Sequence, residues 1–186
     1  MEYPRVLLVD ISTSNLHTLI LSTRSQFEGK PRRVGSRREV HGIDFSPKMV
    51  EIAKQNKPSN LVVTRAEFLE HDFKEDRYDL VIAAAFIHLF PSSYTQDVLK
   101  KAFDLIGPGG HALFTTTQHQ RAEEGFICKP LSTGSVLRYR RRFTPGLLSQ
   151  AIMDAGFTVK KTLQTNDAVD NSKLWVATLA ERPRDQ

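Results

Sequence analysis

The sequence has little cysteine, no long apolar run and no glycine-rich stretch near its start. Its 186 residues include one cysteine, Cys128, which excludes an intramolecular disulfide framework and a multi-cysteine metal site. We therefore expect a cytoplasmic protein without a metal, in which Cys128 acts as a small apolar residue. No apolar run approaches the roughly 20 residues that cross a bilayer, and the first residues lack the order of a secretory signal. This predicts a soluble protein with no membrane partner.

The formal net charge of +5 is unevenly distributed along the chain. Six basic residues fall within residues 24–38, where Glu28 is the single acid. Such a block could contact phosphates, but no aromatic residues alternate with its arginines to stack on bases. We therefore do not expect a nucleic-acid partner, although a nucleic-acid-binding module that uses this block stays an alternative.

Strand-like and helix-like segments alternate from residue 40 onward. This order is typical of an α/β fold with a Rossmann-like, mostly parallel sheet flanked by helices. Together with 40% hydrophobic residues, it predicts one domain over residues 1–186, with an atypical segment at 1–39 and a recognisable core at 40–181. The expected strands are residues 5–10, 40–43, 61–64, 78–83, 111–115, 158–163 and 175–180.

The gaps between these strands carry helix signals. We expect helices at 49–55, from Ser92 or Ser93 up to a tight turn at 107–110, and from a cap at Thr144 to Gly156. The last two strands lack a helix between them, so they should form an antiparallel hairpin. A further helix could cover 15–23, residues 27–38 read as a basic loop, and 118–143 as a polar insert.

The most informative segment is 40–47, Val-His-Gly-Ile-Asp-Phe-Ser-Pro. A short apolar run ends on Asp44, and Ser46 and Pro47 suit the first turn of a helix that follows at once. Ligands of open α/β sheets bind beyond the carboxyl ends of the strands, where an acid can accept hydrogen bonds from both ribose hydroxyls of a nucleoside. Asp44 is therefore our first candidate ligand residue. The alternative is that Asp44 only shares helix capping with Ser46.

Residues 40–181 resemble the class I S-adenosylmethionine-dependent methyltransferases. The resemblance rests on several short motifs in the right order: 40–47, 61–68, 78–89 and 105–110, followed by the terminal hairpin. It implies S-adenosylmethionine as the cofactor, with Asp44 at the adenosyl ribose and Phe45 beside the adenine. It also implies Glu67 near the adenine amino group and Phe68 against the ring.

The remaining implied cofactor contacts are made by backbone. Ala84 and Ala85 would lie beside the methionine portion, but the family's glycine-rich loop after the first strand is missing here. Residues 5–10 can supply that strand and its acid, whereas residues 11–15, Ile-Ser-Thr-Ser-Asn, have Cβ atoms that restrict a close backbone approach. Either a genuine adaptation or an alternative reading of the gene upstream of Val40 accounts for this.

Methyl transfer needs in-line alignment of a nucleophile, and a protein base is optional. Where the acceptor must lose a proton, His119 is our candidate base, with His88 as a packing or capping residue. A plain polar loop role for His119 is the alternative. Inserts after the carboxyl edge of a sheet commonly cover the site, so we expect residues 118–143 to form a lid over the acceptor. The charge of this insert favours acidic acceptors. The alternative is a solvated surface loop with paired charges.

The sequence thus predicts an S-adenosylmethionine-dependent methyltransferase acting on a small-molecule acceptor. The alternative is a catalytically inactive relative that keeps the sheet, has lost the cofactor with the glycine-rich loop, and serves as a binding or regulatory partner.

Overall fold

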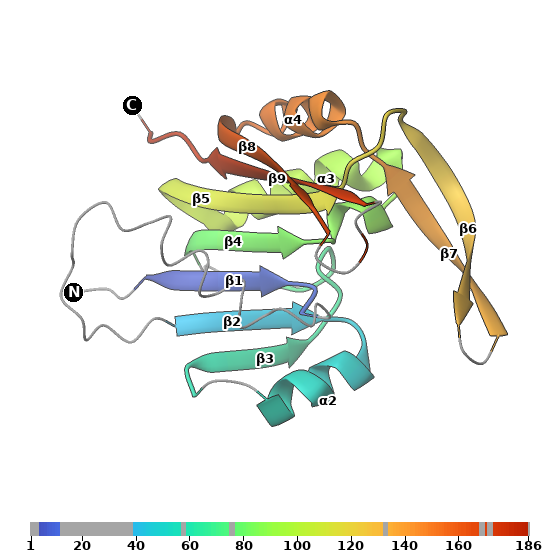
Figure 1. Ribbon diagram of the computed structural model, residues 1–186. Coiled ribbons are helices and arrows are strands. Elements are labelled where there is room, and N and C mark those ends of the chain that lie inside the picture. Colours follow the sequence, from blue (N-terminus) through green and yellow to red (C-terminus); the bar gives the residue numbers. More distant parts are fainter. Residues whose placement is uncertain are drawn as a thin grey trace.

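The computed structural model describes residues 4–11, 39–56, 59–74, 77–131, 134–167, 170 and 173–185. Its main body is a seven-stranded sheet in the order β3-β2-β1-β4-β5-β9-β8 (Figure 1). β1 to β5 run parallel, whereas β9 is antiparallel to β5 and to β8. The strands are β1 Arg5–Val9, β2 Glu39–Asp44, β3 Leu61–Arg65, β4 Tyr78–Ala84, β5 Ile106–Thr117, β8 Thr158–Asn166 and β9 Leu174–Glu181. The predicted fold class, including its antiparallel ending, is confirmed.

Helices cover both faces of the sheet. They are α2 Pro47–Asn56, the 3-10 turn η1 Ile87–Leu89, α3 Ser92–Leu105 and α4 Pro145–Asp154. Successive residues of β1 point to opposite faces, since Leu7 and Val9 join one buried cluster and Leu8 the other. The first cluster lies under α3 and α4, and the second under α2. Each face of the central strands is therefore buried, as in sheets with helices on both sides.

The helix boundaries follow the expected signals. The Thr144 hydroxyl accepts a hydrogen bond from the Leu147 amide at 3.1 Å, Pro145 occupies the first turn, and Gly156 ends the element with φ +101°. α3 begins at Ser92 and ends at Leu105, as predicted.

The tight turn expected at 107–110 is instead a bulge inside β5. Tyr78 pairs with Ile106 and Leu80 pairs with His111, so the four residues between are looped out of the ladder. The loop is held by the Gly109 amide, which donates to the Arg182 carbonyl at 2.8 Å, and by the Arg182 amide, which donates to the Gly110 carbonyl at 2.9 Å. Backbone pairing with the chain beyond β9 thus extends the strand across a glycine-rich sequence.

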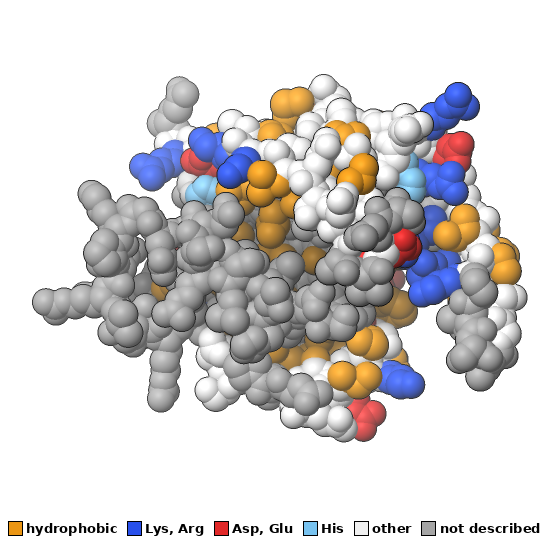
Figure 2. All heavy atoms as spheres, viewed as in Figure 1, with side chains coloured by type: hydrophobic (Ala, Val, Ile, Leu, Met, Phe, Trp, Pro, Cys, Tyr) orange, Lys and Arg blue, Asp and Glu red, His pale blue; other side chains and the backbone are white. Residues whose placement is uncertain are grey.

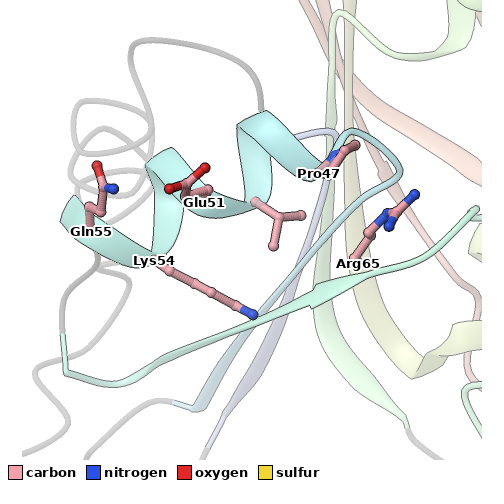
Figure 3. A pocket seen from close by; sticks show the side chains of 6 residues that line it. Pro47, Glu51, Lys54, Gln55 and Arg65 are labelled. Carbon is pink, nitrogen blue, oxygen red and sulfur yellow. The ribbon is translucent and has the colours of Figure 1, made fainter.

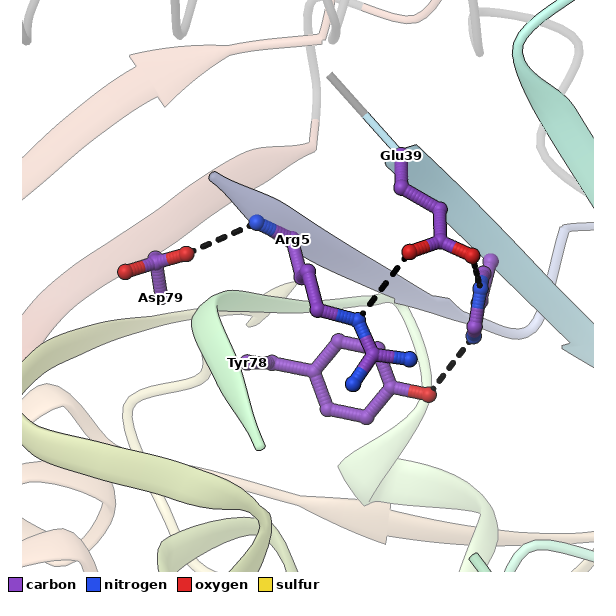
Figure 4. Close-up of polar contacts among 5 residues, drawn as sticks. Arg5, Glu39, Tyr78 and Asp79 are labelled. Atoms are coloured by element: carbon purple, nitrogen blue, oxygen red, sulfur yellow. Dashed lines mark hydrogen bonds and ion pairs between the residues drawn. The ribbon is translucent and has the colours of Figure 1, made fainter. Parts of the chain in front are cut away.

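β1 is an integral strand although it precedes the recognisable part of the sequence. It lies between β2 and β4, paired from Arg5 opposite Glu39 to Val9 opposite Ile43. A polar cluster fixes this register at the start of the strands (Figure 4). The Arg5 amide donates to Asp79 at 2.7 Å, the Arg5 Nε atom lies 3.2 Å from the Glu39 carboxylate, and Glu39 lies 2.9 Å from His41 Nε2.

The insert at 118–143 contains a second, two-stranded sheet. β6 Glu123–Leu131 and β7 Gly134–Arg142 pair antiparallel, and the ribbon projects from the end toward which the parallel strands run (Figure 1). The expected helix at 15–23, the loop at 27–38 and the basic block at 24–38 lie outside the described residues. Within the described ranges, no helix is long and apolar enough to span a membrane.

Candidate functional site

The site is the carboxyl edge of the sheet between β1 and β4. The chain runs outward from β1 to β2 and β3 and then crosses back to β4, so the strand order reverses between β1 and β4. Open α/β sheets bind ligands at such a switch point. The residues that follow the two strands, Asp10 and Ala85, both have left-handed backbone, with φ 58° and 55°. Such strain in residues with a Cβ concentrates at functional sites.

Asp44 lies beside this point, at the end of β2. Its side chain is buried, with 4% exposure, and its two oxygens differ. Oδ1 accepts a hydrogen bond from the Ser46 amide at 2.8 Å, whereas buried Oδ2 has no hydrogen-bond partner in the described structure. The Ser46 hydroxyl in turn accepts from the Met49 amide at 3.4 Å. Oδ1 therefore supports the start of α2, and Oδ2 has no donor among the described residues.

The environment of Asp44 disfavours its charge. Burial is the main cause that raises the pKa of this carboxyl from 3.8 to about 6; the Ser46 and Ile11 amides oppose this shift, and the nearby Asp10 carboxylate contributes to it. A ligand that donates hydrogen bonds to Oδ2 would stabilise the ionised form, as the hydroxyls of a ribose do. Asp10 was not among the candidate residues, because nothing in the sequence shows that its backbone turns it toward Asp44.

The three predicted adenine contacts lie in different surroundings. Phe45 is 64% exposed, and its carbonyl accepts from Arg65 Nε at 3.4 Å. Glu67 is half-buried, and burial followed by the charge of Glu70 raises the pKa of its carboxyl. Phe68 is 3% exposed and packs edge-on against Phe86, with ring centroids 5.4 Å apart. Phe45 thus has an exposed ring that a ligand could stack on, whereas Phe68 is part of the core.

The predicted backbone contacts follow β4. Ala84 is buried, and the Ala85 amide donates to both the carbonyl and the hydroxyl of Thr115, at 2.9 and 3.1 Å. These bonds from β5 hold Ala85 in its left-handed conformation. The loop therefore has one fixed shape at the switch point, which suits a backbone contact to a ligand.

His119 follows β5 at the same edge. Its Nε2 atom lies 3.1 Å from the Thr117 hydroxyl, and burial, reinforced by the Arg142 charge, lowers the pKa of the ring. The ring is therefore neutral near pH 7, as a general base must be. His88 is buried with Nδ1 3.1 Å from the Thr116 hydroxyl, in agreement with the packing role expected for it.

The hairpin β6–β7 is attached beside this edge. The Ser92 amide and hydroxyl, at the start of α3, both donate to the Glu124 carboxylate, at 2.8 and 2.7 Å. Arg141, across from Glu124 on β7, donates to the Thr95 hydroxyl. One face of the ribbon is thereby fixed to α3. Cys128 is exposed on β6.

Two surface hollows lie outside this site. One of about 430 Å³ lies between α2 and β3, where Lys54 and Arg65 extend along a shallow surface (Figure 3). A second of about 510 Å³ includes His71, Phe73 and Lys101, next to α3. The Lys101 ammonium donates to the carbonyls of Leu69 and His71 at 2.6 and 2.9 Å, so it stabilises the loop after β3. Asp44 lines neither hollow.

Comparisons with known proteins identify the fold. A family model described as "Methyltransferase domain" matches residues 30–110. A solved S-adenosylmethionine-dependent methyltransferase from Methanosarcina mazei is similar over 100% of this chain and 95% of its own, with 15% identity and a TM-score of 0.74. The chain has the class I methyltransferase fold.

Other solved structures carry ligands. The 1,6-didemethyltoxoflavin-N1-methyltransferase of Burkholderia thailandensis, solved with 1,6-didemethyltoxoflavin and S-adenosylhomocysteine, is similar over 97% of this chain and 72% of its own, with 14% identity and a TM-score of 0.69. The N-methyltransferase NodS of Bradyrhizobium japonicum, solved with S-adenosylhomocysteine, is 12% identical over 97% of this chain and 79% of its own, with a TM-score of 0.65. No curated protein matches the sequence significantly.

The family match covers only part of the sheet. The match begins at residue 30, before β2, and ends in β5, whereas the methyltransferase fold also uses β1 at its centre. The resemblance stated from residues 40–181 is therefore confirmed for the fold, and the strand expected at residues 5–10 forms its central strand β1.

Proposed function

We propose that this methyltransferase domain binds S-adenosylmethionine at the β1–β4 switch point and transfers its methyl group to a small-molecule acceptor. The unpartnered Oδ2 atom of buried Asp44 is the observation that carries the proposal. A buried carboxylate oxygen without a donor is costly, and a ribose hydroxyl would supply one. The absence of a membrane partner and a cytoplasmic setting remain predictions from the sequence.

The residues fit this cofactor as follows. Asp44 would accept hydrogen bonds from the ribose, exposed Phe45 would cover the adenine, and half-buried Glu67 would lie at the adenine amino group. Phe68 would act through the core behind the pocket, and Ala84 and Ala85 would contact the methionine portion by backbone. The bound cofactor supplies an electrophilic methyl group on a sulfonium.

The chain's own contribution to the chemistry is alignment and one proton transfer. Transfer of this group would form a bond from the acceptor atom to the methyl carbon and break the bond from that carbon to sulfur, whose electron pair would stay on sulfur. An acceptor that carries a proton must then lose it, and neutral His119 can take it at Nδ1, since Nε2 lies beside the Thr117 hydroxyl. Alignment at the switch point supplies the larger part of the acceleration.

Titration calorimetry with S-adenosylhomocysteine tests the proposal. We expect binding to the wild-type protein and at least a tenfold weaker affinity for Asp44→Ala, because hydrogen bonds to a charged group contribute about 1.5 to 3 kcal/mol. Glu39→Gln, at the opposite end of the same strand, is the matched control and should bind normally. An absence of heat at millimolar ligand would overturn the proposal and favour an inactive relative.

A further inference from the structure

The two faces of the ribbon β6–β7 carry different side chains. Cross-strand partners share a face, so Glu124 and Arg141 lie on one side, with Phe126 and Tyr139. The other side carries alternate residues of β7: Arg138, Arg140 and Arg142. Because Glu124 and Arg141 are bonded to α3, the arginine side is turned away from α3.

That arginine face lies toward the switch point. Arg140 is half-buried, and burial lowers the pKa of its guanidinium, an effect that nearby Asp10 at the end of β1 opposes. β7 also contacts η1, the turn that follows β4. Figure 2 shows basic side chains gathered between the body of the sheet and the ribbon, next to an acidic side chain. The arginines therefore border the space beyond β1 and β4.

The three arginines differ in their bonding. Arg142 lies 2.6 Å from Glu123, within the ribbon. For Arg138 and Arg140, by contrast, the described residues provide no hydrogen bond or ion pair, and the Nε atom of Arg138 is buried without a partner. The position across from Arg140 is Gly125, where an added Cβ would meet nothing within 4 Å. Gly125 thus leaves open space across from Arg140, and both arginines are half-buried without a bonded partner among the described residues.

Carboxylates and phosphates are the best hydrogen-bond acceptors for half-buried guanidinium groups. A guanidinium donates two parallel hydrogen bonds to a carboxylate or a phosphate, and such pairs are the strong ones in partly desolvated sites. We propose that Arg138 and Arg140 bind a carboxylate or phosphate group of the methyl acceptor, an inference that rests on the proposed function. The ribbon therefore selects acidic acceptors.

The test measures binding of paired small molecules to the protein saturated with S-adenosylhomocysteine, by titration calorimetry at low salt. The pairs are 4-hydroxybenzoate with 4-hydroxybenzamide, anthranilate with anthranilamide, and phosphoethanolamine with ethanolamine. We expect at least one acid to bind about tenfold or more tightly than its uncharged or unphosphorylated counterpart. Which pair responds distinguishes a carboxylate from a phosphate.

Variants then locate the interaction. The double variant Arg138→Ala/Arg140→Ala should abolish the preference for the acid. Arg140→Lys should retain part of it, because lysine keeps the charge but cannot donate two parallel hydrogen bonds as a guanidinium does. Arg184→Ala is the matched control, since Arg184 is exposed next to Gly109 at the opposite edge of the sheet. An equal loss in that control would show a non-specific charge effect and overturn the inference.

Three other results would also overturn it: no acid binds better than its counterpart, the double variant binds acids normally, or the double variant loses S-adenosylhomocysteine instead. The last would assign the arginines to the cofactor. Calorimetry with S-adenosylhomocysteine alone separates this inference from the proposed function. Failure of that ligand to bind contradicts the function, whereas normal binding without any preference for acids contradicts only the role of the ribbon.

Discussion

The charged groups at the two edges of the parallel sheet differ in how fully they are bonded to one another. At the amino edge, Arg5, Glu39 and His41 are joined to one another and to the Tyr78 hydroxyl, which lies 2.8 Å from His41 Nδ1. The Arg5 side chain also covers the Tyr78 ring, 5.3 Å from its centroid. These contacts fix the register of β1 between β2 and β4.

At the carboxyl edge, two buried polar atoms have no hydrogen-bond partner among the described residues. Asp44 Oδ2 and Arg138 Nε are buried without partners in the described structure, and Asp10 and Ala85 have left-handed backbone. Natural proteins keep such features where a ligand completes them. The amino edge therefore stabilises the fold, and the carboxyl edge is destabilised for function, so variants at the two edges should separate stability from binding.

The largest expected effect is the pH dependence of stability that comes from Asp44. Because the folded-state pKa is raised from 3.8 to about 6, the folded form holds a proton that the unfolded form releases between these values. The contribution of Asp44 to the free energy of unfolding of the ligand-free protein should thus fall as pH rises from 4 to 6, by at most about 3 kcal/mol. Urea denaturation at several pH values measures this.

Asp44→Asn is the decisive comparison for that slope. The variant cannot ionise, so it should lose the part of the slope between pH 4 and 6 that comes from Asp44 and be more stable than wild type at pH 7. Glu39→Gln, at the amino end of the same strand, should keep this part of the slope, because the pKa of Glu39 is lowered and its own contribution has the opposite sign. A stability difference between wild type and Asp44→Asn that does not change over this range would contradict the raised pKa.

The attachment of the ribbon to α3 predicts a smaller change. Glu124→Ala removes the carboxylate that accepts from the amide and hydroxyl of Ser92, so it should lower the free energy of unfolding by about 1 kcal/mol. Glu123→Ala is the matched control on the other face of β6. Its partner Arg142 is exposed, and loss of an exposed pair costs less than about 0.5 kcal/mol. Equal losses in the two variants would mean that the ribbon is not anchored through α3.

The amino edge should respond in stability alone. Tyr78→Phe leaves His41 Nδ1 without its partner and should lower the free energy of unfolding by about 1 kcal/mol. Tyr94→Phe, on an exposed ring, is the control for loss of a hydroxyl and should change little. The affinity for S-adenosylhomocysteine should stay at the wild-type value in both. A weaker affinity in Tyr78→Phe would break the separation between the edges.

Most of the fold followed from the sequence because the signals were local. Apolar alternation marked the strands, and Thr144, Pro145 and Gly156 marked one helix at both ends. The glycine-rich segment at 107–110 was interpreted as a turn, and it became a bulge because Arg182, far along the chain, pairs with it. Local composition could not reveal that partner.

The site was predicted less completely for the same reason. Asp44 was found because it ends a strand, but the left-handed backbone of Asp10 has no sequence signature. The burial of Phe68 against Phe86 depends on packing between distant segments. The insert at 118–143 was interpreted as a lid or a solvated loop, because residues 138–142, Arg-Tyr-Arg-Arg-Arg, show no alternation of polar and apolar residues that would mark a strand.

The smallest expected effect concerns His119, at the border between the sheet and the ribbon. Burial is the main cause of its lowered pKa, and the Arg142 charge adds to it, so the ring should titrate below its ordinary 6.5 in a proton NMR titration. Arg142→Ala should raise this pKa only part of the way back, because burial remains, whereas Arg184→Ala should leave it unchanged. A wild-type value at or above 6.5 would contradict the effect of burial on the ring. A pKa well above neutral pH would leave the ring mostly charged and unable to accept a proton, and alignment alone would then have to account for catalysis.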